Sequence, residues 1–318
     1  MSDTLALDLR KVIDKAVHET LGDSILLSGG LDTSVVAVFA QRWRKIHAYT
    51  VILNDAPAPD LPYAKLIAEK FSIRHTVFAF HLSEIDEGLS HVIRTLQTFD
   101  PMEVRNSLTV FLGLQRAKED GYRAVMTGDA SDELFAGYSF VYKLPHAKIR
   151  ESLERMWGAM RFSSIPLARS LGMEAKLPFL QPAVREFAEK LDPRSLVGSR
   201  EGELFGKYLL RIAFQDDLPS EVVWRTKTPI EFGSGTAILP QYYSQAISDD
   251  LFVSERNEFE KLDHVKIRDK EHLKYYQIYR ELFGPPHPEH GERRVCPSCT
   301  SNVPETTSFC TTCGAYPI

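Results

Sequence analysis

Cysteine is absent from the first 295 of the 318 residues, and all four cysteines lie at positions 296, 299, 310 and 313. The main part of the chain therefore holds no thiol nucleophile, no persulfide and no iron–sulfur ligand set. The first four residues lack the cationic and apolar regions of a secretion signal. The apolar run at 35–40 is far shorter than the ~20 residues that span a bilayer. We therefore expect a soluble, cytoplasmic protein with no membrane partner.

Neither sign of charge is in large excess. The chain has 38 Lys and Arg residues and 43 Asp and Glu residues, which gives a formal net charge of −5. A broad basic surface that would coat nucleic acid is therefore not expected, although this balance leaves room for a local basic patch. A hydrophobic content of 43% and a charged content of 25% are typical of globular proteins. The length predicts ~2 domains.

Short apolar runs that resemble buried strands alternate with helical patterns in the first part of the chain. The predicted strands are 24–27, 47–53, 74–80 and 123–127. This alternation predicts an α/β fold with a parallel sheet covered on both faces. Helices dominate residues 140–280, and a Pro- and Gly-rich linker follows. We expect one domain over 1–283 (a sheet part at about 20–140, a helical part at about 141–283), a linker at 284–294 and a metal module at 295–318.

A glycine loop, SGGLDTS at 28–34, follows the first predicted strand and opens a predicted helix. In this context its backbone N–H groups and the positive end of the helix bind phosphate, and Ser28, Thr33 and Ser34 add hydroxyl donors. Bare phosphates would repel Asp32, so an intervening Mg²⁺ is indicated. There is no GxxxxGK[ST] sequence here, which excludes a kinase-type or GTPase-type loop.

A second motif, VMTGDASDELFAGY at 125–138, again places a glycine and clustered carboxylates after a strand. The carboxyl edge of a parallel sheet is where such folds bind ligands. Adjacent carboxylates repel one another, so a cation nearby is the natural stabiliser.

The glycine loop resembles the SGGxDS[ST] loop of the ATP-pyrophosphatase superfamily. By itself it does not choose among argininosuccinate, NAD, GMP and asparagine synthetases and tRNA thiolases. The second motif and three further ones, at 99–107, 172–180 and 218–235, resemble those of the asparagine synthetase family. Five ordered motifs thus cover about residues 20–245. The resemblance implies an adenine-nucleotide α-hydrolase-like (ATP-pyrophosphatase) fold with a helical second part.

The resemblance also implies a role for each matching residue. Asp129, Lys207 and Lys227 would be catalytic, Asp32 and Asp132 would bind Mg²⁺, and Arg105 and Gln181 would contact the substrate. The expected ATP-binding residues are Leu27, Ser28, Gly29, Gly30, Asp32, Thr33, Ser34, Val51 and Gly128.

Two of these positions depart from the family pattern. The family usually has Glu where this chain has Asp129, which is one methylene shorter. It usually has Asp where this chain has Gln181, and a neutral amide cannot act as a general base. Both changes affect the part of the site that would bind the substrate to be amidated, and they leave the expected ATP-binding residues unchanged.

The final segment contains the pattern CPxC-x10-CxxCG, formed by Cys296, Cys299, Cys310 and Cys313. Two such knuckles build a closed tetrahedral site, so we expect a zinc ribbon with a structural Zn²⁺. Disulfides and free thiols are the alternatives. Few basic residues surround the segment, so nucleic-acid binding is unsupported, and docking of a protein partner is an equal alternative.

These features together predict a ligase that uses ATP and Mg²⁺ to adenylate a small carboxylate such as aspartate, which ammonia or an amine then attacks. The family's glutaminase cysteine is not found in this chain. Nitrogen is therefore expected from free ammonia, an amine substrate or a separate ammonia-supplying protein. Two other functions stay open: a tRNA-modifying enzyme of the same superfamily, and a nucleotide-binding regulator.

Overall fold

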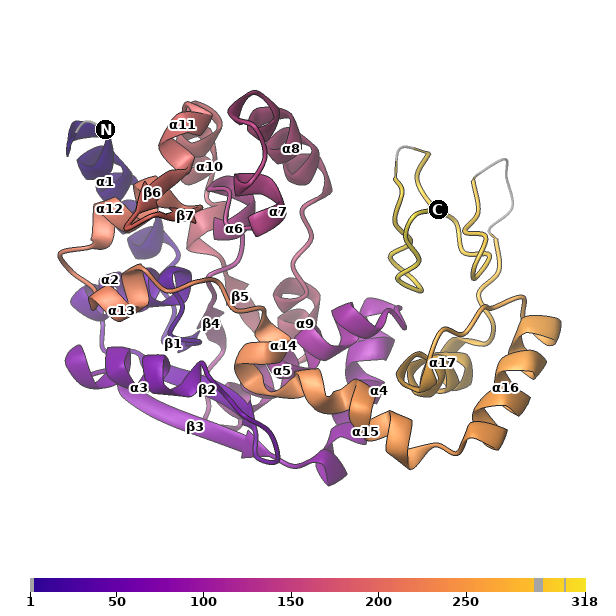
Figure 1. Ribbon diagram of the computed structural model, residues 1–318. Coiled ribbons are helices and arrows are strands. Elements are labelled where there is room, and N and C mark those ends of the chain that lie inside the picture. Colours follow the sequence, from indigo (N-terminus) through magenta and orange to yellow (C-terminus); the bar gives the residue numbers. More distant parts are fainter. Residues whose placement is uncertain (1–2, 289–293, 306) are drawn as a thin grey trace. The chain divides into compact units, whose positions relative to one another are not determined.

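The computed structural model describes residues 3–288, 294–305 and 307–318 (Figure 1). Five residues of the expected linker, 289–293, lie outside the described residues. The chain forms two compact units that interleave along the sequence. Unit 1 comprises Met1–Val51, Ala58–Phe78 and Gly113–Pro229, and unit 2 comprises Ile52–Pro57, Ala79–Leu112 and Ile230–Ile318.

A five-stranded sheet has the strand order β3-β2-β1-β4-β5. Strand β1 pairs in parallel with both β2 and β4, and β4 pairs in parallel with β5. The strands are β1 (Ser24–Leu26), β2 (His47–Leu53), β3 (Arg74–Phe80), β4 (Ala124–Met126) and β5 (Glu174–Lys176). The first four confirm the sequence prediction. The fifth lies beyond the range expected for the sheet and was not predicted.

The core of unit 1 gathers around helix α2, in which every residue from Val35 to Ala40 is buried. A helix that is apolar on all sides is typical of a fully covered position. The described helices of unit 1 are α1 (Asp3–Glu19), α2 (Leu31–Trp43), α3 (Leu61–Lys70), α6 (Ser131–Leu134), α7 (Ser139–Tyr142), α8 (His146–Ala159), α9 (Ser164–Ser170), η2 (Pro178–Leu180), α10 (Pro182–Glu189), α11 (Pro193–Leu196), α12 (Tyr208–Phe214) and α13 (Ser220–Val223). A hairpin of β6 (Gly198–Arg200) and β7 (Glu203–Phe205) precedes α12.

Unit 2 is helical and includes the cysteine-containing segment. Its helices are η1 (Leu82–Glu84), α4 (Ile85–Leu96), α14 (Ile230–Ser234), η3 (Thr236–Ile238), α15 (Leu239–Ala246), α16 (Asp249–Leu262) and α17 (Lys270–Phe283), together with the first part of α5 (Pro101–Glu119). Buried aromatic residues of α17, Tyr275 and Tyr276, contribute to its core. Among the described residues, no helix combines the length and the hydropathy that crossing a membrane requires.

Candidate active site

The order of the strands places a topological switch point beside β1. From β1 the chain continues to β2 and β3 on one side of the sheet, whereas β4 and β5 lie on the other side. Parallel sheets bind ligands at the carboxyl ends of the two strands at which the order reverses. The glycine loop follows β1 and the acidic motif follows β4, so both predicted motifs begin at this position.

Two glycines allow the backbone to approach closely here. Gly29 has a φ of 72°, and a Cβ on it would lie 2.2 Å from the backbone nitrogen of Ala64. A Cβ on Gly128 would lie 2.9 Å from Cβ of Asp32 and 3.1 Å from the backbone nitrogen of Thr33. Gly128 therefore brings the acidic motif into contact with the glycine loop.

The glycine loop keeps its hydroxyl groups close together at the start of α2. The side-chain oxygens of Ser28 and Thr33 lie 3.1 Å apart, and the Gly30 N–H donates to Ser28 Oγ at 3.2 Å. The Ser34 hydroxyl is fully buried, and it has no hydrogen-bond partner among the described residues. These donors and the helix end suit a phosphate chain. Leu27 and Val51, expected beside the adenine, are both buried; Leu27 directly follows β1, and Val51 lies within the last part of β2.

Two carboxylates and two lysines converge at the same position. Lys207 Nζ lies 2.6 Å from Asp32 Oδ2 and 2.7 Å from Asp132 Oδ1. Lys227 Nζ lies 2.5 Å from Asp132 Oδ2. The Ser131 hydroxyl donates to the remaining oxygen of Asp32 at 2.7 Å. Residues more than 170 positions apart in the sequence thus form one alternating cluster of charge.

Local backbone geometry explains how Lys207 reaches this cluster. Its φ of 55° is left-handed, and its N–H donates to the carbonyl of Phe135 at 2.9 Å. The side chain is only 5% exposed. A buried ammonium group requires anionic partners, which the two aspartates supply.

The charges of this cluster shift the pKa values of Asp132 and Lys227. Burial alone would raise the pKa of Asp132, but the charges of Lys207 and Lys227 outweigh it and lower that pKa to about 2. Burial would likewise lower the pKa of Lys227, yet the carboxylates raise it above its usual value. Asp132 and Lys227 are therefore both charged at neutral pH, which suits this pair to bind a metal–nucleotide complex.

Asp129 sits beside the cluster in a different environment. Its Oδ2 accepts hydrogen bonds from the Ser164 hydroxyl at 2.5 Å and the Thr127 hydroxyl at 2.9 Å. Burial raises the pKa of Asp129, although both hydroxyls act in the opposite direction. Sequence reasoning did not find Ser164, because it lies outside all five motifs and reaches Asp129 only through the packing of α9.

The sequence model of the asparagine synthase family matches residues 8–171 and 166–290. The chain belongs to the asparagine synthase family. It is 29% identical over 319 residues to an asparagine synthetase from Zea mays, covering 92% of this chain and 53% of the relative. Its identity to asparagine synthetase B from Escherichia coli is 28% over 307 residues, covering 88% of this chain and 54% of the relative. The chain thus spans about half the length of these curated relatives.

A solved structure of NMN synthetase from Francisella tularensis overlaps 88% of this chain and 94% of its own. Its TM-score is 0.39 and its identity 14%, which is too low a similarity to inform the function.

The two residues expected from the asparagine synthase family to contact the acceptor belong to different units. Gln181 lies in unit 1, half-buried between η2 and α10. Arg105 lies in unit 2 on α5, where its guanidinium donates to Glu271 Oε2. The sequence did not predict this ion pair, because 166 residues separate its two partners.

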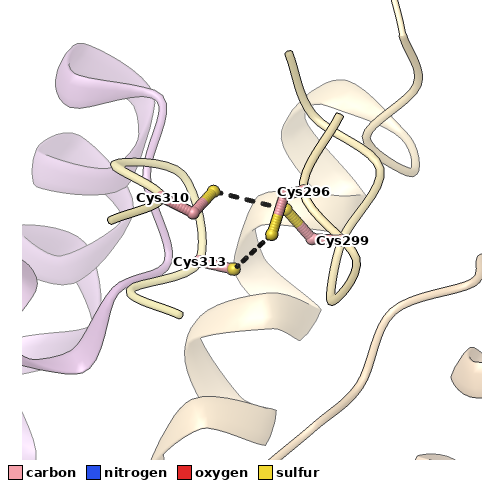
Figure 2. A group of neighbouring side chains, drawn as sticks. All are labelled: Cys296, Cys299, Cys310 and Cys313. Atoms are coloured by element: carbon pink, nitrogen blue, oxygen red, sulfur yellow. Dashed lines mark hydrogen bonds between the residues drawn. The ribbon is translucent and has the colours of Figure 1, made fainter. Parts of the chain in front are cut away.

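The four cysteines form a second candidate site, beyond the segment that matches the asparagine synthase family. Their sulfur atoms point toward one another, two from each of two loops (Figure 2). All the sulfurs lie within 4.8 Å of one another, and Cys296–Cys313 and Cys299–Cys310 are each 3.7 Å apart. A tetrahedron with Zn–S bonds of ~2.3 Å has edges of ~3.8 Å, whereas a disulfide needs ~2.05 Å. The arrangement therefore fits a four-thiolate metal ion.

Proposed function

We propose that this protein is an ATP-dependent amide ligase that releases AMP and pyrophosphate. The observation that carries the proposal is the cluster of Asp32, Asp132, Lys207 and Lys227 beside a glycine loop at the switch point of the sheet. Membership of the asparagine synthase family supports it.

In the first step, an oxygen of the acceptor carboxylate attacks the α-phosphorus of ATP, and the bond to the β-phosphate breaks. The glycine loop would hold the β- and γ-phosphates, and Lys207 and Lys227 would neutralise the charge that develops on the leaving pyrophosphate. Asp32 and Asp132 would hold Mg²⁺, which supplies further positive charge at the phosphates.

In the second step, ammonia or an amine attacks the acyl-adenylate carbon, and AMP leaves. Asp129 is the proposed acceptor of the proton that the attacking nitrogen loses. Its raised pKa suits this role, since a general base works best when its pKa lies near the working pH. The hydroxyls of Ser164 and Thr127 both donate to Oδ2 of Asp129, and neither of these two hydrogen bonds uses a lone pair of Oδ1.

Aspartate is the proposed acceptor, because the curated relatives are named asparagine synthetases. Gln181 replaces the family carboxylate near the acceptor, so a different carboxylate is the alternative that the test must include. The proposed nitrogen source is free ammonia, delivered in the cell by a separate protein. We also propose that the cysteine cluster holds a structural Zn²⁺, since a closed set of four thiolates leaves no open position for a substrate.

The test incubates the protein with Mg²⁺, ATP labelled at the γ-phosphate, ammonium and a panel of carboxylates that includes aspartate. We expect labelled pyrophosphate and an equal amount of AMP with one member of the panel. Exchange of labelled pyrophosphate into ATP without ammonium would report the adenylation step alone.

Asp32→Asn is expected to abolish both products, whereas the exposed Asp216→Asn provides the matched control with unchanged activity. Pyrophosphate release that requires added tRNA would replace the proposal with a tRNA-modifying activity. ATP binding without any product across the panel would favour a nucleotide-binding regulator.

A further inference from the structure

The cysteine-containing segment is joined to the rest of unit 2 by contacts that neither the zinc site nor the proposed reaction requires. We define the ribbon as residues 294–318 without position 306. Hydrogen bonds join it to the residues that precede α5, to those that precede α17 and to Pro286 after α17.

The first contact joins the second cysteine knuckle to residues 98–100. The Thr98 hydroxyl donates to the carbonyls of Thr311 at 2.8 Å and Thr312 at 3.1 Å. The Phe99 N–H also donates to the Thr312 carbonyl, at 2.8 Å. Gly314 has a φ of 73°, and a Cβ on it would lie 2.2 Å from Asp100 Oδ1. The knuckle therefore lies directly against the backbone that leads into α5.

The second contact joins both knuckles to the segment before α17. The Lys266 N–H donates to the Ser298 carbonyl at 2.8 Å, in the first knuckle. The Arg268 guanidinium donates to the carbonyls of Gly314 at 2.7 Å and Cys313 at 2.9 Å, in the second. Buried or half-buried carbonyls that lose such donors pay the cost of desolvation, so these bonds fix the position of the ribbon.

Aromatic packing also joins the residues before α5 to helix α17. The Phe99 ring stacks on His272 with centroids 5.2 Å apart, and lies 5.0 Å from both Tyr276 and Tyr279 of α17. Arg105 in the second turn of α5 forms its ion pair with Glu271 in the first turn of α17. The ribbon, the aromatic layer and the ion pair therefore act on the same two helix starts.

We propose that the metal-bound ribbon is a brace that joins the starts of α5 and α17, and that loss of the metal loosens the first turns of α5. Each knuckle of a short Cys₄ segment takes its shape from the metal, because so few residues cannot build a core of their own. The carbonyls that Thr98, Phe99 and Arg268 bind belong to the metal-binding knuckle. Release of the metal removes these acceptors together.

The two guanidinium groups that the structure describes in this region, those of Arg268 and Arg294, are already engaged with backbone, which argues against a nucleic-acid platform. Arg268 donates to Cys313 and Gly314, and Arg294 donates to the Thr307 carbonyl at 2.5 Å. Phosphate contacts would have to replace these bonds.

The proposal rests on the proposed zinc site but not on the ligase reaction, so its test uses no activity. Zinc content is measured first on the full chain, with one Zn²⁺ per chain expected. Amide hydrogen exchange is then followed with zinc bound and after removal by a chelator. We expect the Phe99 and Lys266 amides to exchange at least ~10-fold faster without zinc, while the Leu27 amide of unit 1, which bonds to Tyr49, is unchanged.

The variant Arg268→Ala, measured with zinc still bound, distinguishes loss of the ribbon contacts from general unfolding of the protein. It should speed exchange at Phe99 and Lys266, whereas the matched control Arg280→Ala, whose guanidinium pairs with Asp263, should not. A chain that binds zinc but shows unchanged exchange in both the zinc-free form and Arg268→Ala would overturn the brace. A chain that binds no zinc would overturn the zinc site and the brace together, while leaving the ligase proposal untouched.

Discussion

Replacement of Gly137 by alanine tests whether the charge cluster of the active site depends on a missing side chain. A Cβ at this position would lie 1.8 Å from Asp132 Oδ1, 2.3 Å from Lys207 Cε and 2.7 Å from Asp132 Cγ. An ordinary carbon–oxygen contact is ~3.3 Å. The Asp132 carboxylate would therefore have to move by more than ~1 Å, which breaks its contacts with Lys207 and Lys227.

The size of the effect follows from two costs. Overpacking a well-filled site costs ~1–3 kcal/mol, and separating a buried ion pair costs up to ~3–5 kcal/mol. Because the lysines can follow the carboxylate in part, we expect Gly137→Ala to lower the free energy of unfolding by ~2–4 kcal/mol and to abolish pyrophosphate formation.

Gly158→Ala is the matched control. Gly158 lies in α8, and nothing stands within 4 Å of a Cβ placed there. Alanine in a helix is favoured over glycine by ~0.5–1 kcal/mol, so this variant should be as stable as the wild type or more so. Urea unfolding and the pyrophosphate assay compare the three proteins. A Gly137→Ala variant within ~0.5 kcal/mol of wild type and fully active would refute the reasoning.

Three further perturbations test the ionisable groups. Ser164→Ala removes a donor to the Asp129 carboxylate and so raises its pKa further; the acid limb of the pH–activity profile should move to higher pH, and an unmoved profile would contradict the positioning role of Ser164. Lys207→Met removes the cation between Asp32 and Asp132 and should slow pyrophosphate formation ~10²–10³-fold; a loss of less than ~3-fold would exclude a catalytic role. Burial raises the pKa of Glu271 from 4.5 to about 7, so the folded state holds its proton longer than the unfolded state and stability falls as pH rises between these values. Glu271→Gln should flatten this fall in a series of melting temperatures, and an equally steep fall in the variant would show that other groups cause it.

The sequence alone was enough to predict the four strands that carry strong apolar runs and the two motifs at the switch point. A buried strand followed by a glycine loop is recognisable because both features are local. Membership of the asparagine synthase family was predictable for the same reason, since the five motifs are short and ordered. The cysteine spacing likewise predicted a closed four-sulfur site, and the sulfur positions fit that prediction.

Strand β5 could not be predicted from its own residues. Glu-Ala-Lys has no preference for extended structure, yet it becomes a strand because β4 offers it backbone partners. Helix α12 begins only at Tyr208, because Lys207 before it takes a left-handed conformation that aims its side chain at the two aspartates.

The tertiary structure alone decided the partners of the charged side chains. Sequence reasoning named Asp32, Asp132, Lys207 and Lys227, but the folded chain made them a single cluster in which each lysine compensates a carboxylate. It also paired Arg105 with Glu271 and fastened the ribbon to residues 98–100 and 266–268. Such contacts join residues far apart in the chain, and only packing determines which of them meet.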